Sequence, residues 1–410
     1  MRKTIFYLLT LLFFVNCSNP KTEEAAPVCA KEEITDERDL PENIPGETMG
    51  QKLESLLFWS QDEKERRYRI MHSIYPSIAV ESGDNLYALK EGERITPQWE
   101  DETTLENYME DNRIGSVIVV QNDEIKLEAH GLGVTQETLW TSYSVAKSVA
   151  SMLVGAALKD GQIESLDDRL DKYITELEGY GYGEVTVREL LTMTSGMGWN
   201  EDYTDPASDV AMMYNAACVG DEAHILSYVK QIERTHEAGE RFNYSTGETD
   251  LVGILIDKAT GMSMAEYLSE KVWKPMGMQQ CAYWLADECS NMNIGGSGLS
   301  ASNRDFARLG LLLLNGGKIN GTSILADEWV SDATSMLYEF DDRDGGYGYL
   351  LWINDDGTYM AEGIFGQMIY VNPALNLVIA QSAAWQEAGS QELSATRQAF
   401  IDAVINALEQ

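Results

Sequence analysis

The chain has 410 residues, of which 67 are Asp or Glu and 30 are Lys or Arg, so its formal net charge at pH 7 is −37. Hydrophobic residues make up 44% of the sequence, which excludes a disordered or fibrous chain and is enough for one large core or two smaller ones. The negative charge argues against a nucleic-acid partner, because phosphates are neutralised by Lys and Arg. The four histidines lie far apart and outside any zinc-ligand spacing, so we expect no metal site and no cofactor.

The first 16 residues have the pattern of a secretory signal. Arg2 and Lys3 precede an apolar run over residues 5–15, which is too short to span a bilayer as a stable helix. Cys17 follows where a bacterial lipoprotein signal is cut and its cysteine lipidated, although Asn16 stands where a small residue is usual. We therefore expect a protein of the bacterial cell envelope, anchored in the membrane by a lipid on Cys17. Ordinary secretion is the alternative.

An acidic stretch with several prolines covers residues 17–49. Its composition predicts a solvated tether between the membrane and a folded domain. Four further cysteines (Cys29, Cys218, Cys281 and Cys289) can form disulfides in an exported chain, and the sequence does not choose among their three pairings. None of them stands beside a histidine in the sequence as a thiol nucleophile would.

The rest of the chain alternates between strand and helix patterns. These predict two strands around a turn within 114–128, an apolar helix over 145–158, helices over 187–194, 208–215, 222–232, 250–258 and 264–272, a helix capped by Ser302, strands over 347–353, 368–371 and 377–381, and a last helix over 391–408. Strands at both ends with helices between them indicate an α+β fold that carries an inserted all-helical subdomain. We expect an α/β domain from residues 50–162 and 291–410, and a helical subdomain from 163–290.

Ser144-Val145-Ala146-Lys147 is an SxxK tetrad at the start of the apolar helix. There the Ser144 hydroxyl lies near the free N–H groups of a helix N-terminus, which stabilise an oxyanion, and Lys147 follows one turn later on the same face. Apolar neighbours lower the pKa of a lysine, and a serine nucleophile needs such a base. The tetrad alone is weak, because 18–21 and 227–230 also match it. The alternative is a lysine that pairs with an acidic residue of the helical subdomain.

The tetrad belongs to a series of six segments along the chain. They cover residues 141–148, 161–167, 190–196, 243–246, 296–305 and 363–367. Together they resemble the serine β-lactamase and penicillin-binding protein superfamily, in particular its class C, esterase-like branch and, within it, the 6-aminohexanoate-dimer hydrolases. The resemblance implies a β-lactamase/transpeptidase-like antiparallel sheet flanked by helices, and a serine hydrolase that cleaves an amide or ester through an acyl-enzyme.

By position, the resemblance assigns a role to each matching residue. Ser144 would be the nucleophile, Lys147 its proton acceptor, and Tyr244 the acid and base between nucleophile and leaving group. The phenol would need an adjacent cation to stabilise its phenolate. The backbone N–H groups of Ser144 and Ile364 would form the oxyanion hole. Three positions match substrate-binding residues of the family: Tyr203, Thr246 and Gly363.

Two departures from the family's pattern bear on the substrate. Glu362 stands in the segment where penicillin-recognising members place Lys or His, so we expect a substrate carboxylate to meet no cation there. Thr246 replaces the asparagine that orients an acylamino carbonyl. We therefore expect a small-molecule amide or ester as substrate, with poor turnover of β-lactams. The alternatives are a β-lactamase or DD-peptidase, and a catalytically silent envelope receptor of the same fold. The oligomeric state is not predicted.

Overall fold

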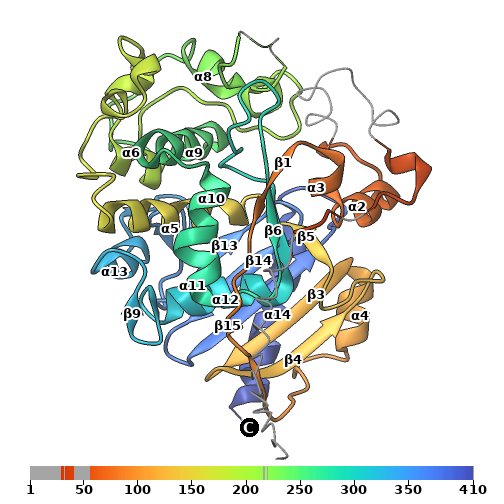
Figure 1. Ribbon diagram of the computed structural model, residues 1–410. Helices are drawn as coiled ribbons and strands as arrows, with labels where there is room; N and C mark the ends of the chain where they lie inside the picture. The colour runs from red at the N-terminus through yellow and green to blue at the C-terminus, as the bar shows by residue number, and fades with distance from the viewer. Residues whose placement is uncertain (1–28, 32, 41–55, 216–217, 219, 410) are drawn as a thin grey trace, which may run out of the picture.

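The computed structural model describes residues 29–31, 33–40, 56–215, 218 and 220–409 (Figure 1). The predicted signal peptide and Cys17 lie outside this range. Within it, no helix combines the length and the apolar character that crossing a membrane would require.

In the described part of the chain, a nine-stranded sheet has the order β10-β11-β12-β13-β14-β15-β3-β4-β2. The strands are β2 (Lys90–Glu91), β3 (Ile114–Gln121), β4 (Glu124–His130), β10 (Tyr338–Glu339), β11 (Gly346–Tyr347), β12 (Trp352–Ile353), β13 (Tyr359–Glu362), β14 (Met368–Asn372) and β15 (Leu377–Ala383). Neighbours run antiparallel, except that β2 is parallel to β4. Because β3 pairs with β15, strands from both halves of the chain meet inside one sheet.

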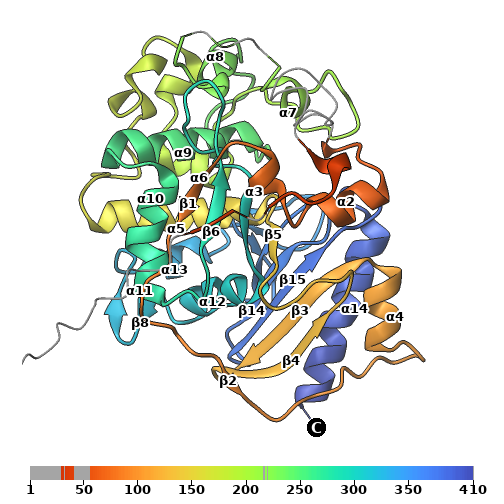
Figure 2. The same cartoon turned by 45° about the vertical axis from the view of Figure 1, so that its right-hand side comes forward.

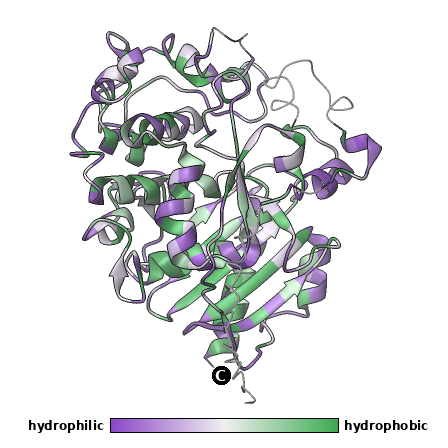
Figure 3. Cartoon of the chain, viewed as in Figure 1, coloured by the Kyte–Doolittle hydropathy of each residue, from purple (hydrophilic) through white to green (hydrophobic). Residues whose placement is uncertain are grey.

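Helices cover both faces of this sheet, as the alternation along β15 shows. Val378 faces α12 (Asn303–Leu314), where Gly310 leaves room for it: a β-carbon there would lie 2.5 Å from the valine. Gln381, on the opposite face, accepts a hydrogen bond of 2.6 Å from Tyr108 of α4 (Leu105–Asp111). That tyrosine stacks on Phe400 of α14 (Gln391–Leu408), and Figure 2 shows α4 and α14 side by side. Figure 3 shows that β3, which contacts both α12 and α4, consists mainly of hydrophobic residues.

The remaining elements form a helical part and a second, four-stranded sheet with the order β1-β6-β7-β5. Its strands are β1 (Ser77–Val80), β5 (Leu139–Thr141), β6 (Ala282–Leu285) and β7 (Leu299–Ser302). The helical part contains η3 (Leu170–Lys172), η4 (Thr175–Leu177), η5 (Gly181–Glu184), α6 (Val187–Thr192), α7 (Asp209–Met212), α8 (His224–Val229), α9 (Thr246–Thr260), α10 (Met264–Leu268), η6 (Ser269–Trp273) and α11 (Lys274–Met276). The central helix α5 (Val145–Lys159) packs against α9 and is buried from Val145 to Ala157, as its all-round apolar sequence predicts.

Shorter elements complete the described chain. They are η1 (Glu37–Asp39), α2 (Gln61–Arg67), α3 (Met71–Ile74), α13 (Trp329–Ala333) and the hairpin β8 (Lys318–Ile319) and β9 (Thr322–Ser323).

The α+β fold class is confirmed, and the strands at 114–128 and the helices at 145–158 and 391–408 lie where the sequence predicted them. The single strand predicted over 347–353 is wrong. The chain turns at Leu350, whose φ is 57°, and this separates β11 from β12. The strand β6 lies within the predicted helical range 163–290 but pairs with β1 and β7. The division into two domains stays a prediction.

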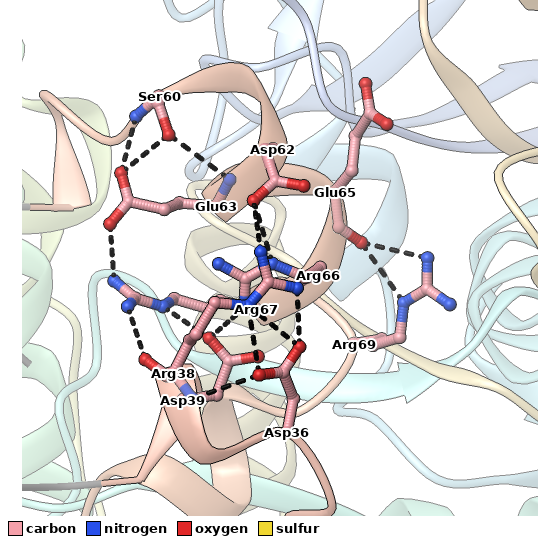
Figure 4. A network of polar contacts seen from close by, with 10 residues as sticks. All are labelled: Asp36, Arg38, Asp39, Ser60, Asp62, Glu63, Glu65, Arg66, Arg67 and Arg69. Atoms are coloured by element: carbon pink, nitrogen blue, oxygen red, sulfur yellow. Dashed lines mark hydrogen bonds and ion pairs between the residues drawn. The ribbon is translucent and has the colours of Figure 1, made fainter. Parts of the chain in front are cut away.

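Part of the predicted tether is docked on the body of the protein. Asp39, which is 1% exposed, accepts a hydrogen bond of 2.8 Å from Arg67 Nε and pairs with Arg66, so two guanidinium groups offset the burial of one carboxylate (Figure 4). A disulfide joins Cys29 to Cys281. The described residues between Cys29 and residue 40 are therefore attached to the body of the protein at Cys29 and Asp39, although Lys31, Glu33 and Glu37 are exposed to solvent; the tether as a whole stays a prediction.

Candidate active site

Ser144 stands directly before the first turn of α5, at the end of a strained turn. Tyr143, the residue before it, has a φ of 43°, which a residue with a side chain adopts only where its surroundings hold it. The rings of Tyr68 and Phe365 hold it here, each with its centre 5.1 Å from that of Tyr143. The Ser144 hydroxyl does not cap the helix, and it lies close enough to the phenol of Tyr244 to affect the pKa of that phenol.

Lys147 is buried one turn further along α5, with 1% of its surface exposed. Its Nζ donates hydrogen bonds to Thr246 Oγ1 at 3.0 Å and to the Gly296 carbonyl at 2.7 Å. Burial lowers its pKa to about 8, although the Glu201 and Asp250 carboxylates oppose this shift. A neutral amine has two N–H donors and one lone pair, so these two hydrogen bonds are compatible with a neutral lysine whose lone pair can accept a proton. Among the described residues no ion pair includes Lys147, so the alternative of a lysine paired with an acid does not describe this structure.

Tyr244 lies between the nucleophile and the lysine. Its ring stacks on Trp352 with centres 5.6 Å apart, and Lys147 Nζ lies 5.3 Å from the ring centre. Burial raises the pKa of Tyr244 above its usual value and the Glu201 carboxylate adds to this, while the nearby Ser144 hydroxyl opposes it. Burial thus favours the protonated phenol in this state, and stabilisation of a phenolate by an adjacent cation stays a prediction.

Glu201 joins this site, and sequence reasoning missed it. Its carboxylate accepts hydrogen bonds from the Tyr203 hydroxyl at 2.8 Å, from the Thr246 backbone N–H at 2.9 Å, and from the Thr246 hydroxyl. Thr246 thus links Lys147 to Glu201. One glutamate among 67 acidic residues gives no sequence signal, because only the fold brings it to the start of α9.

Ser144 and Ile364, whose backbone N–H groups are the predicted oxyanion hole, both line the cavities at the nucleophile. Within the described residues neither donates a hydrogen bond to the protein. Gly363 allows this arrangement, because a β-carbon at that position would lie 2.8 Å from the Ser142 carbonyl. The chain after β13 can therefore approach the chain before the nucleophile only with glycine there.

Two cavities meet at the nucleophile, and Ser144, Ile364 and the predicted substrate residue Tyr203 line both. The first, of about 70 Å³, is also lined by Leu56, Leu57, Tyr143, Val210, Ala211, Met213, Tyr214, Thr246, Ile294 and Ser297. The second, of about 200 Å³, is also lined by Tyr244, Trp352, Glu362, Gly363, Trp385, Gly389, Ser394 and Arg397. The tight cavity is mainly apolar and uncharged, whereas the wider one carries charged groups.

A cation stands where the sequence predicted none. Arg397 of α14 lines the wider cavity and donates a hydrogen bond of 2.7 Å to Glu362. The expectation that a substrate carboxylate would meet no cation here is therefore wrong. No sequence motif links the two residues, because the arginine lies on the last helix, 35 residues beyond its partner.

A cluster away from the nucleophile also differs from expectation. Both ring nitrogens of His224 lie 3.4 Å from Cys289 Sγ, and Cys218 is close enough that the three could together hold a metal ion. The two sulfurs form a disulfide, however, so no thiolate is available as ligand or nucleophile. Asp287 lies 2.6 Å from His224 Nδ1. Sequence spacing did not reveal this histidine beside a cysteine, because 65 residues separate them.

Known proteins resemble the chain over most of its length. Residues 102–402 match the model of the Beta-lactamase family. The 6-aminohexanoate-dimer hydrolase of Paenarthrobacter ureafaciens is 25% identical over 364 residues, which cover 85% of this chain and 92% of the relative. A solved Bacillus anthracis structure named for the same hydrolases has 24% identity and a TM-score of 0.75, covering 84% of this chain and 94% of that one. A family VIII carboxylesterase structure has 17% identity and a TM-score of 0.57, covering 74% and 95%. These matches confirm the resemblance found in the sequence.

Proposed function

The chain belongs to the Beta-lactamase family, and on that basis we propose that it is a serine hydrolase that cleaves a small-molecule amide or ester through an acyl-enzyme on Ser144. One observation supports this above all. The Ser144 hydroxyl lies close enough to the Tyr244 phenol to lower the pKa of that phenol, and a buried lysine whose pKa is about 8 lies beside the same ring. A nucleophile, a proton relay and a base thus meet between two cavities.

In the proposed reaction, Ser144 Oγ attacks the substrate carbonyl carbon while its proton passes to neutral Lys147 by way of Tyr244. The two free N–H groups, of Ser144 and Ile364, bind the oxyanion. Tyr244 then delivers the proton to the leaving nitrogen or oxygen, and the amine or alcohol departs. Water repeats the sequence on the acyl-enzyme and releases the acid. Thr246 and Glu201 orient the lysine, while Tyr203 and Gly363 border the bound substrate.

Stopped-flow kinetics with p-nitrophenyl acetate tests this proposal. We expect a burst of one p-nitrophenol per chain, followed by slower turnover, and loss of both in Ser144→Ala. Ser227→Ala is the matched control, because Ser227 and Lys230 form a second SxxK tetrad on the solvent side of α8, where they bind Glu222. A burst that survives in Ser144→Ala would exclude the acyl-enzyme, and no burst in the native protein would favour the silent receptor.

A β-lactamase or DD-peptidase is the second candidate, and the position of Arg397 favours it. This guanidinium could bind a substrate carboxylate in the wider cavity, but it is already hydrogen-bonded to Glu362. Because a β-lactam carboxylate would have to displace Glu362, we expect poor β-lactam turnover. Nitrocefin hydrolysis above about 10 per second, a rate ordinary for enzymes, would favour this candidate instead.

We also propose that the protein is anchored in the bacterial envelope through a lipid on Cys17. The support is the sequence of residues 1–17 alone. Metabolic labelling with a palmitate analogue, followed by membrane fractionation, compares the native protein with Cys17→Ala. Label and membrane association should both be lost in the variant; label that persists would contradict the anchor.

A further inference from the structure

We infer that the tight cavity is an acyl pocket for an uncharged, apolar acyl chain, and that Leu56 and Leu57, near the start of the predicted α/β domain, form part of its wall. The inference rests on the proposed function, because it needs Tyr244 as the acid that protonates the leaving group. It assigns a selective role to two residues that the sequence did not connect with the site.

The position of Tyr244 shows which cavity would hold the leaving group of the substrate and which would hold its acyl chain. Tyr244 lines the wider cavity and not the tight one, so the leaving group that it protonates must lie in the wider cavity. Because the oxyanion donors Ser144 and Ile364 border both, the carbonyl carbon sits at their junction. The acyl chain therefore extends into the tight cavity.

The wall of the acyl pocket selects by polarity. Among the described residues that line it there is no Lys, Arg, Asp or Glu, in a chain where 24% of residues are charged. Two carboxylates that bind residues of this wall are already engaged: Glu201 accepts hydrogen bonds from Tyr203 and Thr246, and Asp250 accepts one from Tyr214. A charged acyl chain would lose its hydration without gaining a partner, whereas each methylene buried there adds a favourable contribution.

Leu56 and Leu57 are held in place by the helix that follows them. Ser60 caps α2 with a reciprocal capping box. Lys64, on this helix, donates hydrogen bonds to the carbonyls of Trp385 at 3.2 Å and Gln386 at 2.8 Å, which fixes α2 against the chain after β15. Leu56 itself belongs to the hydrophobic core.

Asp39 stabilises the position of α2 at the C-terminal end of the helix. It binds Arg66 and Arg67 near the helix C-terminus, and the Arg67 guanidinium lies 4.9 Å from the ring centre of Trp59, the second residue after Leu57 (Figure 4). Asp39 is thus a positioning residue: it touches no substrate but holds the helix that presents the two leucines.

The test measures kcat and KM for three p-nitrophenyl esters: acetate, heptanoate and 6-aminohexanoate. The last two have acyl chains of equal length, but only one carries a charge. In the native protein, kcat/KM should be at least about tenfold higher for heptanoate than for acetate, since each buried methylene adds about fourfold. It should also be at least about tenfold higher for heptanoate than for 6-aminohexanoate.

Leu56→Ala and Leu57→Ala should each lower the heptanoate-to-acetate ratio of kcat/KM about threefold to tenfold, through KM for heptanoate. Asp39→Asn should lower the same ratio in the same way. Phe58→Ala is the matched control: its side chain is 56% exposed and lines neither cavity, so the ratio should not change.

A heptanoate-to-acetate ratio that is the same in the leucine variants as in Phe58→Ala would overturn this inference, as would equal turnover of the charged and uncharged esters by the native protein. The second comparison needs no variant, so it holds even if a leucine variant fails to fold. Acetate turnover that survives in Ser144→Ala is a different result: it overturns the proposed function itself.

Discussion

At the scale of single residues, the site depends on which groups keep their protons. Lys147 is buried near Glu201 and Asp250, and burial outweighs the attraction of these carboxylates for a proton, so its pKa falls to about 8. Tyr244 shifts the other way and stays protonated. The lysine is thus the base and the phenol the acid at the start of the cycle.

The pH profile follows from this assignment. The protonated lysine has no lone pair, so kcat/KM for p-nitrophenyl acetate should rise as the pH increases through about 8 and then level off. In Glu201→Gln one carboxylate that favours the ammonium form is lost, so the midpoint of the rise should move to lower pH by roughly 1 unit. If the substitution only disturbed the structure, kcat/KM would fall without a change in the pH midpoint. An unchanged midpoint would therefore contradict the role of Glu201.

Glu248 couples the stability of α9 to pH. Burial raises its pKa from 4.5 to about 8, so between these values the folded protein holds a proton that the unfolded chain has released. The stabilisation is full below about pH 4.5, decreases as the pH rises, and is lost above about pH 8; it is at most about 5 kcal/mol. Glu248→Gln cannot ionise. The urea midpoint should therefore decrease between pH 5 and pH 9 by less in the variant than in the native protein. An equal decrease in the two proteins would contradict this account.

At the scale of elements, the end of β13 determines whether the oxyanion hole forms. Gly363→Ala would place a β-carbon 2.8 Å from the Ser142 carbonyl and 2.7 Å from Gln367 Oε1, so the chain carrying the Ile364 N–H must move away. We expect kcat to fall about 100-fold with a small change in KM, because this donor acts mainly on the transition state. Gly357→Ala, where a β-carbon meets nothing within 4 Å but φ is 82°, is a control for glycine loss. An unchanged kcat in Gly363→Ala would exclude Ile364 from the hole.

The length of an element decided how well its sequence predicted it. The helices α5 and α14 and the strands β3 and β4 have enough residues to display a period, and their predicted bounds differ little from the observed ones. The strands β11 and β12 have two residues each, too few to show a period. The turn between them depends on a positive φ at Leu350, which cannot be predicted from a leucine side chain. The helix α7 is likewise shorter than predicted.

At the scale of the whole molecule, two disulfides hold distant parts together. Cys29–Cys281 closes a loop of 252 residues and Cys218–Cys289 one of 71. Replacing either pair by serine should lower the free energy of unfolding by about 2–4 kcal/mol, and the longer loop should cost about 1 kcal/mol more because it restricts the unfolded chain more. Urea unfolding of both double variants under oxidising conditions measures the difference. A smaller loss for the longer loop would contradict the entropic argument.

The candidate site was predictable only as far as its residues lie in motifs. Ser144, Lys147, Tyr244 and Ile364 stand in segments that resemble a family, and the structure brings them together. The remaining parts come from tertiary packing. Glu201 comes from a loop, Arg397 from the last helix, and Leu57 from the start of the predicted α/β domain; each belongs to a residue type too common to single out in a sequence.

The central claim is that the Ser144 hydroxyl, with Lys147 as its base, is acylated by the substrate. A fluorophosphonate probe with intact-mass readout tests it most directly, on the native protein, Ser144→Ala, Lys147→Ala and the control Ser227→Ala. The account predicts one adduct on the native protein and the control, none on Ser144→Ala, and labelling slowed by at least about 100-fold in Lys147→Ala. An adduct that forms on Ser144→Ala at the native rate would contradict it.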